Sequence, residues 1–403
     1  MSSRTDLTGR TTRAGDLGQP VLAGIVTAVV GFTSSFAVLL TGLTAVGASP
    51  AEASSGLFVC CLTMGVGSVL FSLATRNPVT LAWSTPGAAL LAGAAAPDGG
   101  YASAVGAFAL AGLLYVLTGL FSPLARLVRA IPLALANAML AGVLLVLCVQ
   151  PFRALVDEPG AVAPVLMTWL VLLRVARRWA VPGAFAAAVV VIAATGSLSA
   201  VDSSAVAPQL TWTTPGFDPA TVLAIGVPLY LVTMTSQNIP GAAVLASFGY
   251  GAPLRPALFY AGGATVATAG LGGYSINLAA ISAALAAGPE AHPDPGRRWL
   301  AGVSTGVTHL ALGPLAAGVA AVAVAAPPGL VAAVAGVALL GTFGSAAASA
   351  MGDADHREAA TVTFVVAASG VAAFGVGAAF WSLLAGGLYL LVMGHRAQTR
   401  ASH

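Results

Sequence analysis

The sequence has 403 residues, of which 58% are hydrophobic and 7% are charged, and its mean hydropathy is +0.93. A soluble domain is nearer a quarter charged, so this composition excludes a soluble globular protein and predicts a chain that mostly faces the lipid bilayer. The net charge of +3 comes from arginines scattered over many short loops, which argues against nucleic-acid binding.

The chain opens with a polar segment, residues 1–19, which we expect to be a cytoplasmic tail without a cleavable signal. Apolar stretches follow that are long enough to cross the membrane, at about 20 residues each. They begin near Pro20, Pro50, Gly100, Ile131, Ala161, Pro182, Pro219, Pro253, Gly302, Pro328 and Val362. When two interrupted segments are added and the final run is divided at Gly370, the pattern predicts an all-α polytopic membrane protein of about fourteen crossings.

The first interrupted segment carries the string Trp-Ser-Thr-Pro-Gly at residues 83–87. Residues 79–83 favour an extended backbone, Thr85 suits a helix N-cap, and Pro86 suits the first helical position, where no N–H is needed. We therefore predict a short extended stretch and then a half-helix that begins at Thr85 and runs to Ala95.

The second interrupted segment carries Gly-Gly-Tyr-Ser-Ile-Asn at residues 272–277. Ser275 can cap a helix and residues 276–287 favour one, so a second half-helix is predicted there. Irregular backbone at membrane depth is tolerated only where it is buried in protein or lines a wet cavity. Two half-helices in matching positions therefore predict a site where their N-termini bind an anion. The alternative is a pair of glycine and proline kinks filled by neighbouring helices.

The two halves of the chain present similar features in the same order. Each half begins with a segment that has a polar centre, at residues 32–36 and 235–241. In each half the interrupted segment is the third predicted crossing. Because seven crossings is an odd number, the halves would be inserted upside down relative to one another. The expected organisation is a first repeat at 20–200, a periplasmic linker at 201–217, a second repeat at 218–394 and a cytoplasmic tail at 395–403.

Polar and aromatic side chains near the breaks are the candidates for a binding site. The amides at 237 and 238 are favoured because buried amides need partners, and the aromatic residues provide an apolar wall, although Phe36 and Trp83 equally suit packing. His309 is the titratable group near mid-depth and the candidate proton carrier; a neutral histidine bonded to a carbonyl is an equal alternative. The substrate-binding candidates are Ser34, Ser35, Phe36, Trp83, Ser84, Thr85, Gln237, Asn238, Tyr274, Ser275 and Asn277.

The charges bear on the ligand and on orientation. No Asp, Glu or Arg falls inside the predicted spans, which favours an anionic or neutral ligand. With a cytoplasmic amino terminus, every arginine except Arg153 falls on the cytoplasmic side, so both termini are expected there. No metal or cofactor is expected, since the acidic cluster at 353–358 favours a plain loop. The Gly302-x-x-x-Gly306 motif favours packing within the chain, and a homodimer stays open.

Three strings carry a resemblance to a known family. Residues 31–36 (Gly-Phe-Thr-Ser-Ser-Phe), 77–88 (Asn-Pro-Val-Thr-Leu-Ala-Trp-Ser-Thr-Pro-Gly-Ala) and 236–241 (Ser-Gln-Asn-Ile-Pro-Gly) resemble the benzoate:proton symporter (BenE) family. The resemblance covers essentially the whole membrane portion. It implies the seven-plus-seven inverted-repeat fold of the uracil, xanthine and sulfate-type carriers. It also implies a core domain at 20–120 plus 218–322, a gate domain at 121–200 plus 327–394, and elevator-like movement between them.

The resemblance further implies uptake of benzoate, or a similar aromatic monocarboxylate, together with a proton across the inner membrane. Nucleobase relatives use membrane glutamates for substrate binding and proton coupling, whereas this sequence has Gln237, Asn238 and Asn277 in the corresponding stretches. The residue that carries the proton is therefore left open. The first alternative is a nucleobase or inorganic-anion carrier of the same fold. An intramembrane enzyme is poorly supported, because the spans hold no nucleophile with a base and no metal-ligand string. A channel is the last alternative, and saturable accumulation would exclude it.

Overall fold

The computed structural model describes residues 15–94, 96–121, 132–196, 207, 209–280, 282–371, 373 and 378–401. Most of the predicted tail at 1–19, the linker residues 201–206 and 208, and the predicted half-helix end at Ala95 lie outside the described residues. The arginines at positions 4, 10, 13, 126 and 129 lie outside them as well.

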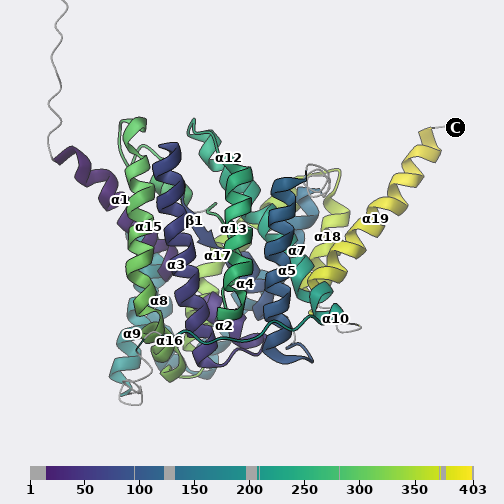
Figure 1. The fold of residues 1–403 in the computed structure, drawn as a ribbon. Coiled ribbons are helices and arrows are strands. Elements are labelled where there is room, and N and C mark those ends of the chain that lie inside the picture. Colours follow the sequence, from purple (N-terminus) through teal and green to yellow (C-terminus); the bar gives the residue numbers. More distant parts are fainter. Residues whose placement is uncertain are drawn as a thin grey trace, which may run out of the picture.

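The described part of the chain is mostly helical, and eight of its segments form helices long and apolar enough to cross a membrane. In its first half the elements are α1 (Gly15–Thr33), α2 (Phe36–Ala45), α3 (Pro50–Thr75), β1 (Leu81–Trp83), α4 (Thr85–Ala92), α5 (Gly100–Leu120), α7 (Leu133–Asp157), α8 (Pro159–Val175), η1 (Arg177–Trp179) and α9 (Ala180–Ala194). α1 begins and α19 ends on the same side of the molecule (Figure 1).

The second half begins at α10 (Pro219–Thr221). It continues with η4 (Val222–Gly226), α11 (Val227–Thr233), η5 (Met234–Asn238), α12 (Ile239–Ser247), α13 (Leu254–Thr268), η6 (Ala269–Leu271), β2 (Ile276–Leu278), α14 (Ala283–Ala287), η7 (Pro295–Arg297), α15 (Trp299–Leu312), η8 (Gly313–Leu315), α16 (Ala316–Ala325), α17 (Leu330–Gly352), α18 (Arg357–Ala368) and α19 (Ala378–Ala401). The division of the final run at Gly370 is confirmed, because α18 ends two residues earlier and Gly370 has a φ of 66°.

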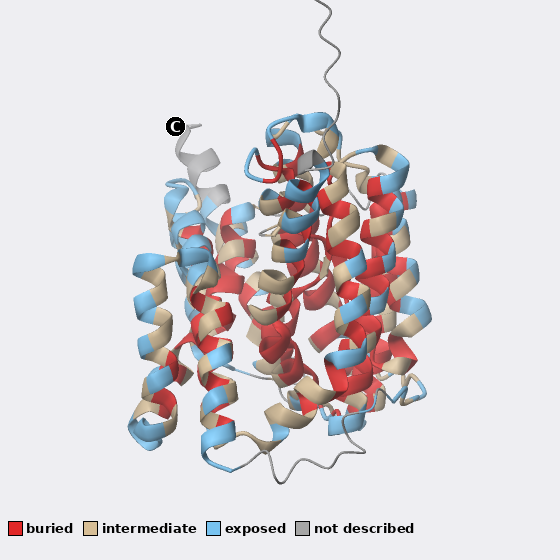
Figure 2. Cartoon of the chain, turned by 90° about the vertical axis from the view of Figure 1, so that its left-hand side faces the viewer, coloured by how far each residue is buried: buried red, intermediate tan, exposed pale blue. Residues whose placement is uncertain are grey.

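The helices pack into two groups. In one, α15 packs against α1 and α3, α5 against α13, and α2 against α4; in the other, α7 packs against α17 and α18, α8 against α9, and α18 against α19. Figure 2 shows buried residues through the interior and exposed ones on the outer faces. The outward stripe of α3 is apolar, with Leu62, Val66, Leu70 and Leu73 all exposed. A continuous exposed apolar face of this kind suits lipid contact.

The GxxxG motif of α15 packs against α3 within the chain, as the sequence predicts. A Cβ atom at Gly306 would lie 2.6 Å from the carbonyl oxygen of Gly65, and one at Gly302 would collide with the hydroxyl of Ser72. Small residues at this face let the two helix backbones approach closely. The motif is therefore occupied by an intrachain contact.

The two broken segments meet in an antiparallel ladder. β1 pairs with β2 so that Ala82 lies opposite Asn277, and Leu81 and Trp83 lie opposite Leu278 and Ile276. The ladder is fastened to α3, because the Leu81 N–H donates to the Ser68 hydroxyl at 2.8 Å and the Ser72 hydroxyl donates to the Val79 carbonyl at 2.8 Å. The extended stretch predicted before the first half-helix is thus confirmed.

Two details of the predicted half-helices are wrong. The first helix begins at Thr85, but Ser84 is its N-cap, and the Ser84 hydroxyl accepts from the Gly87 N–H at 3.1 Å. In the second segment, residues 276–278 form β2 instead of a helix, and the helix spans only Ala283–Ala287. Pairing with β1, together with side-chain bonds from the Ile276 N–H to Thr265 and from the Leu278 N–H to Asn238, satisfies backbone groups of β2 and overrides the local preference for helix.

The helical segment at 219–247 contains two π-helical turns, η4 and η5. Each lies two residues before a proline, Pro228 or Pro240. Proline has no N–H and its ring clashes with the carbonyl four residues earlier, so a wider turn at this point relieves the conflict. The polar centre predicted at residues 235–241 therefore includes a π-helical turn, a structure often found at functional sites.

Candidate functional site

A cavity of about 790 Å³ lies beside the ladder, between the two groups of helices. Its inner wall comes from α1, β1, the start of α4, η5 and α15, and its other wall comes from α7, the start of α9, and α17. Small-molecule pockets in proteins typically measure about 300–1,000 Å³, so the cavity suits a small organic ligand.

Six of the predicted site residues line this cavity, and six do not. Those that line it are Ser34, Ser35, Trp83, Thr85, Gln237 and His309. Those that do not are Phe36, Ser84, Asn238, Tyr274, Ser275 and Asn277. Polar lining residues outside the predicted set are Asn137, Arg177, Arg178, Thr235, Ser236, Ser282, Thr342, Ser345 and Ser349.

An aromatic wall stands on one side of the cavity. The rings of Phe32 and Trp83 meet edge to face with centroids 5.8 Å apart, and both residues line the cavity. The Trp83 indole donates to the Ser35 hydroxyl at 2.9 Å, and that hydroxyl donates to the Gly31 carbonyl at 2.8 Å. These bonds fix the indole plane, so the wall is preformed for an apolar ring.

Phe36 packs against other aromatic rings, which is the packing alternative that the sequence left open for it. Its ring stacks on Phe32 at 5.6 Å and meets Phe185 of α9 edge to face at 4.7 Å. Phe36 thus packs behind the cavity wall, at a contact between the two groups of helices.

Hydrogen-bond donors from η5 line the same cavity as the aromatic wall. Gln237 is 5% exposed, and its amide forms no hydrogen bond with another described residue. The Ser236 hydroxyl is buried and likewise has no partner in the described chain. Since buried polar groups are nearly always satisfied, unpartnered donors beside a cavity indicate a place for a polar ligand or water.

The N-terminus of α4 offers few free backbone N–H groups for binding an anion. Pro86 has no N–H, and the Gly87 N–H is bonded to Ser84, so Thr85 offers the one backbone N–H of the first turn that is left without a partner in the described structure. α14 has only five residues and its Ser282 forms no cap bond. The expectation of two matching helix N-termini is therefore wrong. The second helix has only five residues and begins at Ala283, seven residues after the predicted start, so it does not mirror α4.

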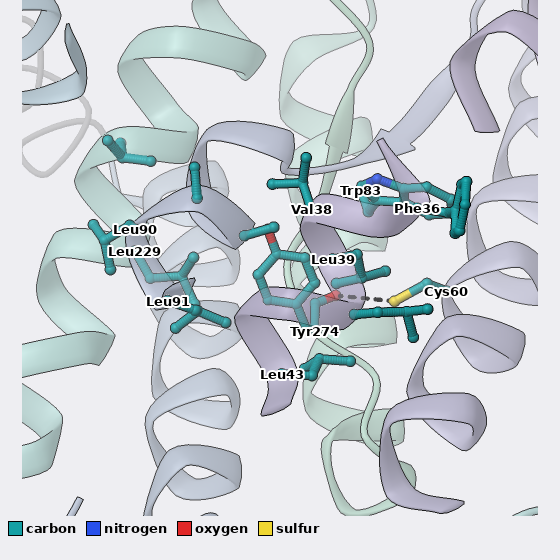
Figure 3. Close-up of a cluster of buried hydrophobic side chains, with 14 of the residues drawn as sticks. Phe36, Val38, Leu39, Leu43, Cys60, Trp83, Leu90, Leu91, Leu229 and Tyr274 are labelled. Carbon is teal, nitrogen blue, oxygen red and sulfur yellow. Dashed lines mark hydrogen bonds between the residues drawn. The ribbon is translucent and has the colours of Figure 1, made fainter. Parts of the chain in front are cut away.

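The remaining predicted residues build a hydroxyl cluster behind the site. The Thr233 hydroxyl donates to the Ser84 hydroxyl at 2.7 Å and accepts from that of Ser275 at 3.2 Å; Ser275 in turn lies 2.6 Å from the Tyr115 hydroxyl. Tyr274 donates to the Ser84 carbonyl and is fully buried. Figure 3 shows Tyr274 among Leu39, Leu91 and Leu229, with its carbonyl accepting from the Cys60 thiol. Together these contacts clamp the ladder.

The two asparagines near the ladder differ in their bonding. The Asn238 amide oxygen accepts from the Leu278 N–H at 3.0 Å, which ties η5 to β2. Asn277 is fully buried, yet neither its amide nitrogen nor its oxygen has a partner among the described residues. Asn277 lies opposite Ala82 and two residues before Ala279, and both alanines line the cavity. Asn277 is therefore a buried neighbour of cavity-lining residues and does not itself line the cavity.

His309 lines the same cavity from α15, is 5% exposed, and its Nδ1 has no partner in the described structure. The alternative of a histidine bonded through this nitrogen to a carbonyl is thus not what the structure contains. No described lining residue is acidic, and the permanent charges at the cavity are those of Arg177 and Arg178. The potential inside it is therefore suited to an anion.

The site residues that sequence reasoning missed include every lining residue of α7, α9 and α17. Thr342, Ser345 and Ser349 recur at helical spacing on α17, and this polar stripe was the available signal. Single Ser and Thr residues in membrane helices more often bond their own backbone, so the stripe alone was weak.

Comparisons with known proteins agree with this architecture. A family profile described as "Benzoate membrane transport protein" (BenE) matches residues 18–392. The "Inner membrane protein YdcO" of Escherichia coli is 38% identical over 373 residues, which cover 93% of this chain and 95% of that protein. The "Benzoate membrane transport protein" of Acinetobacter baylyi is 29% identical over 374 residues, or 92% and 94% of the two chains.

Two solved structures share the fold at low sequence identity. The transmembrane domain of the cyanobacterial bicarbonate transporter BicA aligns with a TM-score of 0.59 at 17% identity, covering 93% of this chain and 98% of that one. SLC26A9 aligns with a TM-score of 0.63 at 11% identity, covering 95% of this chain and 66% of that one. The chain therefore has a mostly helical membrane transporter fold of the BicA and SLC26 type.

Proposed function

We propose that this chain, which belongs to the benzoate membrane transport (BenE) family, is a secondary active transporter that imports benzoate or a similar aromatic monocarboxylate together with a proton. The observation that carries the proposal is one cavity that combines a preformed aromatic wall, unpartnered hydrogen-bond donors and no acidic side chain among its described lining residues. An aromatic ring with one carboxylate matches all three properties.

In the proposed binding mode the ring lies against Phe32 and Trp83. The carboxylate accepts hydrogen bonds from Gln237, Ser236 and the Thr85 N–H, and Asn277 supports it from beneath the cavity surface. Hydrogen bonds to a charged group contribute about 1.5–3 kcal/mol each, so a few of them suffice for micromolar binding. Ser35 holds the aromatic wall in place through its bond to the Trp83 indole, and Ser34 lines the same cavity.

His309 is the proposed proton carrier. It lies in the same cavity as Gln237, and one ring nitrogen is free to take a proton. If one proton accompanies one monoanion, a transport cycle moves no net charge. Uptake should then respond to a pH gradient and hardly to membrane potential. In His309→Gln, benzoate exchange should persist while accumulation driven by the pH gradient is lost.

The proposed mechanism is an elevator. The cavity lies between the two packing groups, which supports a core domain of residues 20–120 plus 218–322 moving against a gate domain of residues 121–200 plus 327–394. These domains belong to the proposed seven-plus-seven inverted repeat, with both termini cytoplasmic in the inner membrane and with dimerisation still open. Cysteines at positions 36 and 185, where the two groups touch, provide a test, because a short bismaleimide bridge should stop transport and leave binding intact.

The decisive experiment is uptake of radiolabelled benzoate into proteoliposomes with an inward proton gradient, with uracil, sulfate and bicarbonate as competitors. Accumulation that collapses with the gradient and is blocked only by aromatic acids is the expected result. Competition by sulfate or bicarbonate would favour an inorganic-anion carrier, which the structural likeness to a bicarbonate transporter keeps as the second candidate. Competition by uracil would favour a nucleobase carrier.

A further inference from the structure

Two adjacent arginines stand at the mouth of the cavity. Arg177 and Arg178 belong to η1, at the junction of α8 and α9, and both line the cavity. Both are exposed, and neither forms an ion pair or a side-chain hydrogen bond with another described residue. Their guanidinium groups are therefore available to a ligand.

The wall contributed by α17 is polar but uncharged. Thr342, Ser345 and Ser349 line the cavity at intervals of three and four residues, so they follow one face of the helix toward its end. The Asn137 amide donates to the Ser349 hydroxyl at 2.9 Å, which places the start of α7 beside the end of α17. A row of hydroxyl groups thus lines the cavity together with the arginine pair.

Charge at such a mouth has a known physical effect. Low-dielectric walls focus the field of fixed charges, which raises the local concentration of oppositely charged ligands and their association rates by about 10- to 1,000-fold. A guanidinium also matches a carboxylate geometrically, with two parallel N–H···O bonds. The mouth therefore combines long-range attraction with a short-range fit for a carboxylate.

We propose that Arg177 and Arg178 form an outer anion site, which captures a small carboxylate before it reaches the central site beside Gln237. The choice of an organic carboxylate rests on the proposed function. The capture of an anion rests on the arginine pair alone. The outer site acts on the association step, since a captured ligand must still move past the hydroxyl row to the aromatic wall.

A membrane-topology role for the same arginines predicts a different outcome. Basic residues at helix ends anchor orientation whether or not they line a cavity. Arg174 is the matched control, because it is exposed in the last turn of α8 and does not line the cavity. If the arginines only anchored the helix ends, substitutions of Arg174 and of the pair would have the same effect on anion association.

The experiment measures benzoate association with the purified full-length protein in detergent by stopped-flow fluorescence, with Trp83 in the cavity wall as a reporter. In the double variant R177Q/R178Q the association rate constant should fall about tenfold at low ionic strength and lose its salt dependence. The dissociation rate should change less than twofold. R174Q should match the wild type, and R177K/R178K should keep the salt dependence, because it keeps the charge.

Equal association rates and salt dependence in wild type and R177Q/R178Q would overturn the outer site, as would the same loss in R174Q. Should the double variant unfold, R177Q and R178Q are measured singly. Each should then lower the logarithm of the association rate constant by about half as much as the double variant. If the wild type binds no benzoate, the substrate assignment fails, and the same series is run with bicarbonate and sulfate. A salt-dependent loss confined to the pair would then uphold the outer site, and no binding of any of the three anions would overturn both proposals.

Discussion

The two broken segments meet in one ladder but are built differently after it. In the first, only Ser84 separates β1 from α4; Ser84 caps α4, whose N-terminus lies at the cavity. In the second, residues 279–282 separate β2 from α14, which has five residues and no side-chain cap. The halves therefore share a position and a strand pairing, yet only the first offers a helix N-terminus of useful length.

This difference changes how an anion would be bound. A helix dipole develops over several aligned turns, so a single turn contributes little of it. The second half instead contributes side chains from the π-helical turn η5, with Ser236 and Gln237 in the cavity and Asn238 on β2. In the proposed binding mode, recognition thus depends on amide and hydroxyl donors from one half and a helix end from the other.

The largest expected effect comes from replacing Gly272, which lies at the break of the second segment. Its φ is 81°, and a Cβ atom there would lie 2.9 Å from the carbonyl oxygen of Glu52 and 3.0 Å from Gly56. Gly272→Ala should therefore destabilise the protein by about 2–4 kcal/mol through strain and overpacking. Thermal unfolding in detergent measures this. Gly263→Ala is the control, because nothing lies within 4 Å of its added methyl group; equal melting temperatures of the two variants would contradict the prediction.

Gln237→Ala tests whether the second half acts through side chains. Removing one donor to a carboxylate should weaken benzoate binding by about 1.5–3 kcal/mol, or roughly 10- to 100-fold in Kd. Isothermal titration measures the affinity, and thermal unfolding should be unchanged because the amide has no protein partner. Gln150→Ala is the control, since that exposed side chain bonds only its own helix at Val146. Wild-type affinity in Gln237→Ala would remove Gln237 from the site.

A pair of serine variants compares the two helix starts directly. Ser84→Ala removes the cap of α4 and the acceptor of the Thr233 hydroxyl, so the protein should lose about 1–2 kcal/mol of stability. Ser282→Ala removes no cap bond and should stay within about 0.5 kcal/mol of the wild type. Both are read by thermal unfolding. A similar loss in both variants would mean that the two starts are equivalent after all.

Asn277→Ala should have the smallest effect on stability. The substitution removes two buried polar atoms that have no partner in the described structure, which offsets the lost packing, so stability should change by less than about 0.5 kcal/mol. Benzoate uptake should nevertheless fall several-fold if the amide supports the carboxylate. Asn238→Ala is the contrasting variant, because it leaves the Leu278 N–H unsatisfied and should cost about 1–3 kcal/mol. Unchanged uptake in Asn277→Ala would leave that amide without a role in transport.

The sequence predicted the membrane fold class and the first break, and half of the site residues it predicted line the cavity. These features follow from hydropathy and from the turn chemistry around Pro86, which are local properties. The second half-helix could not be predicted, because β2 forms only when β1 arrives from almost two hundred residues away. For the same reason the sequence could not show the partners of Ser84, Tyr274 and Ser275. Ser84 bonds Thr233 and Ser275 bonds Tyr115, while Tyr274 bonds the Ser84 carbonyl, and each partner is remote in the sequence.

The π-helical turn at Met234–Asn238 has a consequence for comparing related chains. A π turn holds one residue more than an α turn does, and each residue of an α-helix turns the chain by about 100°. Deleting one residue here would restore a uniform α-helix and rotate Gln237 away from the cavity relative to Pro228 and the residues before it. A one-residue gap at this place in an alignment would therefore signal a rearranged binding site, whereas a gap of the same size in a surface loop would leave the site intact.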